Sequence, residues 1–353
     1  MSGSADHGSK AQATVRLQLA EVHRLGSEAL QGLGCSRGQA DAIAETMTAA
    51  ERDGAAWHGL VRVSFYGRAI RGCEVIPDAQ PTLHDLAPGV VRVDGGLGFA
   101  PLALKVGVPV LAERARSEGI AALALNNVFH ITALWPEIER LTDAGLVAFA
   151  FTGANEYVLP AGGTEAVYGT NPMAFGWPRA NGSPVIIDQA ASVCARGEIR
   201  RHLELGLDIP EGWAVGPDGM PTTDPAQALA GAQLPFGGHK GASIALMVEL
   251  LAGALIGDLF SFEAGRHDIH DVGAPRGGEF MLAIDPGRCV ASERAPDSQA
   301  RGESLFTRIL EQDGTRLPGQ RRYEFRERAR RHGVDIPVAL VTELQAMAST
   351  GKK

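Results

Sequence analysis

A glycine-rich turn followed by a long apolar segment constrains the fold of this chain more than any other feature. The turn reads LPFGGHKG (Leu234–Gly241), and Glu249 is the only charge in the segment Ala242–Ile256 that follows it. At about 15 residues, this run is shorter than the roughly 18–20 apolar residues that cross a membrane. The pattern therefore predicts a helix that runs through the buried core of a soluble protein.

The start of this predicted helix is a candidate anion site. A helix N-terminus offers free N–H groups and the positive end of the helix dipole, which together favour a bound phosphate. Gly237 and Gly238 allow an anion to approach the main chain, and Lys240 adds a full charge. A glycine-rich loop that only begins a helix is the simpler interpretation. The spacing does not match that of a P-loop.

Length and charge narrow the class of protein. The 353 residues predict two or more domains or one elaborated α/β unit. A content of 45% hydrophobic and 21% charged residues is typical of soluble globular proteins. The net charge of −8 argues against a nucleic-acid partner, because phosphate backbones select an excess of Lys and Arg. The basic segment Arg321–Arg331 is interleaved with glutamates, which predicts a solvated helix face.

Cysteine usage and the N-terminal segment bear on location. Cys35, Cys73, Cys194 and Cys289 are scattered without C-x-x-C spacing, which is typical of a reducing compartment. The N-terminal segment MSGSADHGSKAQ is polar and lacks the apolar core of a signal peptide. The expected location is the cytoplasm, with no membrane partner.

Hydrophobic periodicity and turn residues predict helices alternating with strands. Strands are expected over Ile120–Leu125, Leu146–Thr152, Pro184–Ile187 and Glu279–Asp285, with a turn at Asp94–Gly96. Helices are expected within Thr14–Leu33, from Ser36 to Glu51, from Trp57, over Leu102–Glu118 and Pro136–Thr142, and from Arg196. The segment Ser261–Gly278 is expected to be irregular, and the rest of the chain to be helical apart from Asp313–Gly319.

Local motifs alone identify little chemistry. His58 and Arg62 are four residues apart, which places both on one side of the predicted helix, although a surface turn with a solvated arginine is the simpler interpretation. No G-x-S-x-G, Cys/His pairing or G-x-G-x-x-G is present, so a hydrolase or a Rossmann site is unsupported. His267 and His270 lack further ligands at metal-binding spacing, so a flexible loop is favoured and no metal site is expected.

A set of longer motifs, taken together, carries a resemblance. The motifs are WHGLVR, NNVFHITALWPEIE, YGTNPMAF, VIIDQAASVCARGEI, IPEGWAVGPDGMPTTDP, LPFGGHKGASIALMVELLAGAL and GTRLPGQRR. In order and spacing they resemble the malate/L-lactate dehydrogenase-type oxidoreductases, from about residue 15 to residue 345. Within that family, HITALWP, LPFGGHKG and TRLPGQRR are most similar to the branch that reduces cyclic ketimine carboxylates.

The resemblance implies a fold and an assembly. The fold is an α/β (α+β) arrangement without a Rossmann domain, in which helices flank a mixed, largely antiparallel sheet. Residues 14–90 with 296–350 are expected to form a helical domain, and residues 91–295 to bind cofactor and substrate. Family members are homodimers, so a homodimer is the expected state, and a small molecule is the expected substrate.

The resemblance also assigns roles to individual residues. His58 corresponds to the proton donor, and Arg62 to the residue that holds the substrate carboxylate. Further substrate contacts correspond to Thr170, Arg196 and Gly197. The contacts to NADP, with NAD as a possible substitute, correspond to His130, Ile131, Thr132, Ala133, Leu134, Asp188, Gln189, Ala190, His239, Lys240, Asp313, Gly314, Thr315, Arg316, Leu317, Pro318 and Gly319.

These residue types suit the implied reaction. Hydride delivered to the carbon of a C=N bond leaves a nitrogen that needs a proton, which a histidine can supply. The planar fork of an arginine binds a carboxylate with two parallel hydrogen bonds. Such a protein would be an NADPH-dependent reductase of a cyclic ketimine carboxylate that gives an L-amino acid.

Two positions depart from the family pattern. The family has Ser-His where this chain has Trp57-His58, and Asp where it has Glu198. An indole N–H donates but cannot accept, so Trp57 cannot relay a proton as a hydroxyl does. We expect His58 to act with Glu198 alone and Trp57 to reshape the substrate pocket. Two alternatives stay open: a 2-oxo acid reductase or 2-hydroxy acid dehydrogenase, and a catalytically silent homologue that binds nucleotide.

Overall fold

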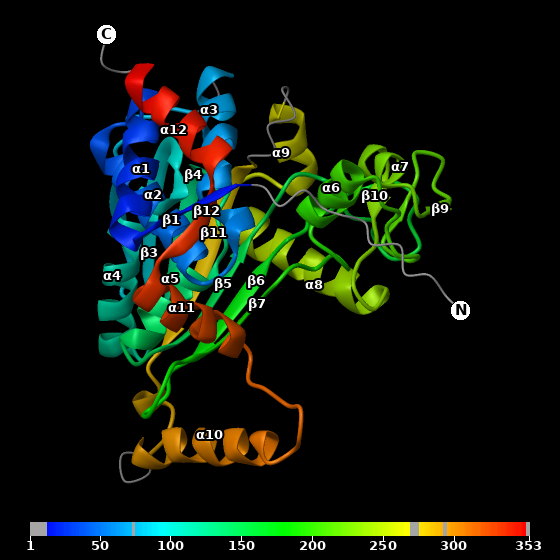
Figure 1. Ribbon diagram of the computed structural model, residues 1–353. Coiled ribbons are helices and arrows are strands. Elements are labelled where there is room, and N and C mark those ends of the chain that lie inside the picture. The colour runs from blue at the N-terminus through cyan, green and yellow to red at the C-terminus, as the bar shows by residue number, and fades with distance from the viewer. Residues whose placement is uncertain (1–12, 73–74, 269–274, 292–294, 351–353) are drawn as a thin grey trace.

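A seven-stranded sheet forms the centre of the protein, seen here in a computed structural model (Figure 1). The structure describes residues 13–72, 75–268, 275–291 and 295–350. The strand order is β2-β3-β4-β11-β5-β6-β7, and only β3 and β4 pair in parallel. The strands are β2 (Thr82–Ala87), β3 (Val90–Phe99), β4 (Ile120–Phe129), β5 (Val147–Thr152), β6 (Met173–Trp177), β7 (Val185–Gln189) and β11 (Arg276–Ile284). This is the mixed, largely antiparallel sheet that the family resemblance implied.

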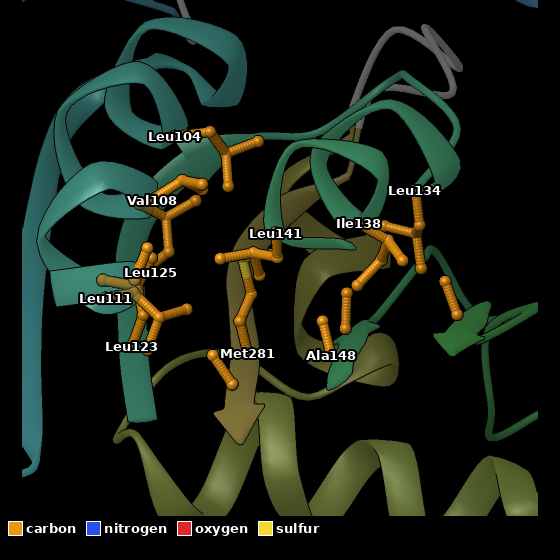
Figure 2. Close-up of a cluster of buried hydrophobic side chains, with 14 of the residues drawn as sticks. Leu104, Val108, Leu111, Leu123, Leu125, Leu134, Ile138, Leu141, Ala148 and Met281 are labelled. Carbon is orange, nitrogen blue, oxygen red and sulfur yellow. The ribbon is translucent and has the colours of Figure 1, made fainter. Parts of the chain in front are cut away.

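Alternating side chains give the sheet two apolar faces. On one face, α4 (Ala100–Glu118) packs on β3 and β4 and α5 (Trp135–Asp143) on β5 and β6, with Leu111, Leu141 and Met281 in the shared core (Figure 2). On the other face, Phe280 of β11 joins a smaller cluster. Phe280 and Met281 are adjacent in the strand, so they point to opposite sides of the sheet.

A helical layer brings the two ends of the described chain together. Strand β1 (Thr14–Leu17) pairs with β12 (Val334–Pro337) in a separate two-stranded sheet. The helices of this layer are α1 (Leu19–Gly32), α2 (Arg37–Arg52), α3 (Val63–Arg71) and α12 (Val338–Thr350). A Cβ at Gly32 would overlap the Met347 backbone, so the absence of a side chain lets α1 and α12 approach closely. Strand β12 is a correction, because this part of the chain was predicted to be helical.

The remaining elements lie at the edges of the sheet. They are the three-stranded sheet β8 (Ala214–Val215), β9 (Pro221–Thr222) and β10 (Ala232–Gln233), and the helices α6 (Arg196–Leu205), α7 (Pro225–Ala230), α9 (Ser261–His267), α10 (Ala295–Leu310) and α11 (Gln320–His332). Helix α10 lies at the far end of the β6–β7 hairpin (Figure 1), where its Phe306 packs with Trp177 and Val185. Helix α9 corrects the expectation of an irregular segment there, and His270 falls outside the described residues. No helix of the described part has the length and apolar composition to span a bilayer.

The long apolar helix was predicted to be buried, but one side of it is exposed. The segment forms α8 (His239–Glu249), which continues as a π-helical turn, η3 (Leu250–Leu255). Val248 and Ala252 pack against Phe280, but Leu246, Leu250 and Leu255 are 45%, 51% and 61% exposed. The helix therefore covers one face of the sheet and turns an apolar stripe outward. Burial was the wrong inference because apolar residues on every side also fit a helix whose outer face meets a partner.

The segment around His58 also differs from the prediction. A single helix from Trp57 was expected, but Ala56–His58 and Leu60–Arg62 form separate 3-10 turns before α3 begins at Val63. The Glu51 carboxylate lies against Gly59 and accepts a hydrogen bond from Leu60 N (2.8 Å). A side chain at Gly59 would overlap that carboxylate, so the buried acid sets the break between the turns.

The predicted turn at Asp94–Gly96 is instead a bulge inside β3. The pairing of β3 with β4 shifts register between Asp94 and Gly98. Gly96 and Leu97 have φ angles of 60° and 62°. These left-handed residues take up the extra length without ending the strand.

Most charged side chains of Arg321–Arg331 are exposed, as predicted, but Arg326 is an exception and belongs to a buried ion-pair network. Arg326, on α11, is 9% exposed and binds Asp53 (2.6 Å) and Glu139 (2.6 Å). Arg52 binds the same two carboxylates. Burial alone would raise the pKa of Asp53, but the Arg52 and Arg326 guanidinium groups outweigh it and lower that pKa. The network joins the end of α2 to α5 and α11.

Arg326→Met should reduce the free energy of unfolding by roughly 3 kcal/mol, because it leaves buried carboxylates with one partner fewer. Denaturant titration measures the change. The loss should be full above the ordinary Asp53 pKa of 3.8 and shrink in acid, where the lowered pKa of Asp53 is passed and the carboxylate is protonated. Arg330→Met on the same helix is the control, because Arg330 is exposed and its ion pair with Glu327 lies at the surface. Equal stability of the two variants would contradict the role of the network.

Candidate active site

One pocket of about 550 Å³ brings together most of the residues with predicted roles. Its walls come from the turns before α3, the end of β4 with the following loop, the end of β7 and the start of α6. The predicted residues that line it are Trp57, His58, Arg62, His130–Leu134, Thr170, Asp188–Ala190, Arg196 and Gly197. Segments more than a hundred residues apart in sequence thus form one site.

Some of the predicted contacts lie outside this pocket. His239 and Lys240 are exposed at the start of α8. The preceding Phe236 donates its N–H to the Ala191 carbonyl (3.0 Å), so the start of α8 lies beside the Asp188–Ala190 wall. In the predicted loop Asp313–Gly319, only Leu317 is buried. The end of this loop and the first turn of α11, residues Arg316–Arg322, line a second cavity of about 350 Å³. Their contacts with a cofactor stay predictions.

His58 is enclosed, and the charged groups that act on it are positive. Burial, the Arg62 charge and the His130 charge lower the pKa of His58 to about 4, against a smaller opposing effect of its hydrogen bond to the Ile131 backbone. Its Nδ1 atom is buried and has no hydrogen-bond partner within the described residues. The Trp135 ring meets it edge to face, with centroids 6.2 Å apart. In the free protein at neutral pH, His58 is therefore an uncharged imidazole.

Arg62 faces the same pocket without a carboxylate partner. Its Nε donates to the Trp57 carbonyl (2.7 Å), and its guanidinium stacks on Phe65 at 4.8 Å from the ring centroid. Burial, assisted by the charges of Arg200 and Arg68, lowers its pKa. No ion pair to Arg62 exists among residues that the structure describes. An enclosed cation without a counter-ion is a natural binding group for an anionic ligand.

Trp57 packs against the start of α6. A Cβ at Gly197 would overlap the Trp57 indole nitrogen, so only glycine fits below this ring. The indole N–H is buried and unpaired in the described structure. Glu198 lies elsewhere: its carboxylate binds Arg201 (3.1 Å) and does not line the pocket. The predicted pairing of Glu198 with His58 is not seen in this arrangement and stays a prediction.

Asp188 has a structural task in addition to its place in the pocket. Its carboxylate accepts hydrogen bonds from Leu134 N (3.1 Å) and Trp135 N (3.0 Å), which satisfies N–H groups at the start of α5. Burial raises its pKa, although these hydrogen bonds and the Arg322 charge act in the opposite direction. Asp188 thereby holds the loop His130–Leu134 against β7.

Several pocket residues were not found from the sequence. Trp135 and Arg322 are the most important, because Arg322 stacks on Trp135 at 5.2 Å and donates to the Ile186 carbonyl (2.9 Å). Arg322 belongs to the basic segment that was assigned to solvent. No local signal distinguishes it from its neighbours. The other missed residues are Val61, Phe65, Thr152–Asn155, Tyr157, Pro172, Ala195, Arg200, Glu204 and Pro275.

The sequence of residues 17–345 matches the malate/L-lactate dehydrogenase family. The chain belongs to this family. Its relatives are dehydrogenases and reductases, so the protein is an oxidoreductase. The family resemblance inferred from the sequence motifs is confirmed.

Individual relatives cover almost the whole chain. It is 50% identical over 333 residues to the Delta(1)-pyrroline-2-carboxylate/Delta(1)-piperideine-2-carboxylate reductase of Pseudomonas aeruginosa, covering 94% of this chain and 99% of that protein. It is 41% identical to the (2R)-3-sulfolactate dehydrogenase (NADP(+)) of Chromohalobacter salexigens, covering 94% and 98%. The crystal structure of delta1-piperideine-2-carboxylate reductase from Pseudomonas syringae superimposes with a TM-score of 0.89 at 37% identity, covering 95% and 100%.

Three buried polar atoms in the pocket residues have no partner within the described structure. Thr132 Oγ1, Trp57 Nε1 and His58 Nδ1 are all buried and lack hydrogen-bond partners in the described structure. Buried polar atoms of native proteins are seldom left unpaired unless a ligand or water completes them. Three such atoms around one pocket therefore fit a bound ligand.

Gly197→Ala should lower kcat/KM by about tenfold or more, because the new methyl group displaces Trp57 and the adjacent His58. The combination with Trp57→Ser should restore most of the loss, since serine leaves room for the methyl group. Steady-state kinetics with circular dichroism as a check on folding measures both. Leu205→Ala is the control for the helix, because Leu205 is exposed at the end of α6 and does not line the pocket. If the double variant is no better than Gly197→Ala, the proposed contact does not limit activity.

Proposed function

We propose that this protein is an NADPH-dependent reductase of cyclic ketimine carboxylates of the pyrroline-2-carboxylate or piperideine-2-carboxylate kind. The observation that carries the proposal is the juxtaposition in one pocket of Arg62, an enclosed cation without a counter-ion, with His58, whose Nδ1 atom has no hydrogen-bond partner in the described structure. The 50% identity to a reductase of these two substrates supports the ring chemistry.

The protein's own residues position the substrate and move the proton. The terminal amino groups of Arg62 bind the carboxylate, because its Nε is already held by Trp57. This places the C=N carbon in the pocket, with the ring nitrogen toward His58. A nicotinamide held along His130–Leu134 and Asp188–Ala190 would supply the hydride for the carbon. His58 gives a proton to the nitrogen, so C=N becomes CH–NH, and solvent later returns a proton to the imidazole.

Substrate binding itself prepares His58 for this task. The Arg62 charge is one cause of the low pKa of His58 in the free protein. A carboxylate bound to Arg62 cancels part of that charge, so it raises the pKa of His58 and favours its protonated form. Binding and proton supply are therefore coupled through one arginine.

Arg62→Met should raise KM for pyrroline-2-carboxylate or piperideine-2-carboxylate by about a hundredfold, because a hydrogen-bonded charge pair is lost. His58→Asn should instead lower kcat by about a hundredfold or more, because the proton donor is removed. NADPH absorbance with both imines, pyruvate and oxaloacetate in parallel measures these effects. Arg68→Met is the control, because Arg68 stacks on the other side of Phe65 and does not line the pocket. Turnover of the oxo acids but not of the imines would overturn the proposal.

A second candidate function is dehydrogenation of a 2-hydroxy acid. The 41% identity to a sulfolactate dehydrogenase favours it specifically. The same Arg62 and His58 serve this reaction, since a ketone differs from an imine by one atom. Binding of NADPH without turnover of either substrate class would indicate a catalytically silent homologue.

We infer the preference for NADPH from one arginine, Arg316. Arg316 is exposed in the loop Asp313–Gly319, and that loop leads into Arg322 of the pocket wall. The name of the sulfolactate relative specifies NADP(+), which supports the same cofactor here. The dinucleotide would extend from His130–Leu134 along Asp188–Ala190 toward Lys240, where the start of α8 favours phosphate.

Arg316→Ala should weaken the binding of NADPH by about tenfold and change the binding of NADH by less than twofold, because only NADPH has the 2′-phosphate. Cofactor fluorescence titration measures both dissociation constants. Arg308→Ala is the matched control, since Arg308 is exposed and pairs with Glu311 on α10. Equal weakening of the two cofactors would place the 2′-phosphate elsewhere.

We also infer a homodimer. The exposed apolar stripe Leu246, Leu250 and Leu255 on α8 and η3 is of the kind that subunit interfaces cover. Sedimentation equilibrium of the purified protein decides between monomer and dimer.

A further inference from the structure

Three buried titratable groups meet in the wall of the pocket. His130 follows β4, Glu137 lies in the first turn of α5 and Glu279 lies on β11. The His130 Nε2 atom is 3.2 Å from Glu279 Oε2 and 3.7 Å from Glu137 Oε1. All three side chains are at most 5% exposed. His130 also lines the pocket, so the cluster connects the protein interior with the bound substrate.

The three groups of the cluster compensate one another's charge, and most of their polar atoms form no other interaction in the described structure. His130 Nε2, Glu137 Oε1 and both carboxylate oxygens of Glu279 have no well-directed hydrogen-bond partner among the described residues. A net charge in such a place is costly, because little solvent compensates it. Two carboxylates and one neutral imidazole carry a net charge of −2, so the cluster becomes neutral overall when it takes up two protons. An imidazolium, one carboxylate and one carboxylic acid meet this condition.

The protonation preferences of the groups agree with this distribution. Burial lowers the pKa of His130, but Glu137 and Glu279 more than offset this and raise it to about 10. Burial and the Glu279 charge raise the pKa of Glu137. Glu137 is therefore the better of the two positions for the carboxylic acid, and Glu279 for the carboxylate. The two histidines of the pocket have opposite preferences, because His58 is disposed to be neutral.

The other charged neighbours come from several elements. A charged His130 disfavours protonation of His58, which lies in the turns before α3, and the Arg62 charge has the same effect. Asp188, on β7, is attracted to His130. Arg276 of β11 pairs across the sheet with Phe129, next to His130. None of these lies between His130 and its two carboxylates, which remain its nearest partners.

We propose that Glu137 and Glu279 are positioning residues for the reduction: they hold His130 as an imidazolium that faces the anionic substrate beside Arg62. The cluster is neutral overall, but His130, its positive end, lines the pocket, whereas the two glutamates do not. The His130 charge also keeps His58 neutral until a carboxylate enters the pocket. This role rests on the proposed function for its substrate. The protonation of His130 does not, because it belongs to the free protein.

The direct test is the titration of the histidines by NMR in full-length protein labelled at histidine Cε1. Signals are assigned with His58→Asn and His130→Asn. We expect His130 to stay protonated from pH 6 to 9 and His58 to stay neutral. Glu137→Gln should leave His130 charged, because one carboxylate suffices. The double variant E137Q/E279Q should make His130 neutral at pH 7, since burial then acts unopposed, and should raise the pKa of His58.

Kinetics then test the consequence for substrate binding. In the double variant, KM for the imine carboxylate should rise about tenfold at pH 7.5 while kcat changes less, because a charge near the anion is lost. Glu249→Gln is the matched control: Glu249 is also buried, binds Asn171 and Ser261, and does not line the pocket. It should leave both histidine titrations and KM unchanged.

Two results would overturn the proposal. One is a wild-type His130 that is neutral at pH 7, a result that needs no variant to fold. The other is one equivalent of Zn²⁺ or Mn²⁺ that survives dialysis in the wild type and is lost in the double variant, because a metal-bound Nε2 carries no proton. If His130 is charged but no imine is reduced, the proposed function fails and the cluster stands.

Discussion

The buried ion pairs of Arg326 with Asp53 and Glu139 are the interaction on which the pocket depends. They tie α11, from the C-terminal part of the chain, to the end of α2 and to α5. Asp53 also accepts a hydrogen bond from the Trp135 indole (3.1 Å), and the same ring meets His58 edge to face. A charge network behind the pocket therefore fixes the aromatic wall that orients the imidazole. Because breaking a buried pair is costly, this wall is held rigidly.

The two cationic groups of the pocket differ in how many carboxylates neighbour them. Arg62 is enclosed without a carboxylate, whereas His130 is surrounded by two. Both arrangements leave positive charge facing the ligand, and both disfavour a charged His58 until an anion arrives. Recognition of the carboxylate and delivery of the proton thus share one electrostatic cause. Trp57, at the position where the sequence resemblance implied a serine, adds an apolar wall to the same pocket.

Most of the fold could be predicted from the sequence, and the errors have physical causes. Ser36 caps α2 as expected, because its hydroxyl accepts a hydrogen bond from Gln39 N. The strand β12 was missed because four residues that pair with the far end of the chain have no local signal. The bulge at Gly96 was taken for a turn because glycines mark both. The break at Gly59 depends on the buried carboxylate of Glu51, a contact between side chain and backbone that no local motif at Gly59 indicates.

The sequence by itself determined the family, the fold class and the residue types of the site, because motifs such as WHGLVR and LPFGGHKG keep their order and spacing. Only the tertiary structure decided which charges are compensated. Arg326 and Arg322 look alike in a basic helix, yet one is paired in the interior and the other lines the pocket. Glu137 and Glu279 are 142 positions apart and meet only through the sheet. Burial and partnership are properties of three-dimensional neighbours, which local sequence does not encode.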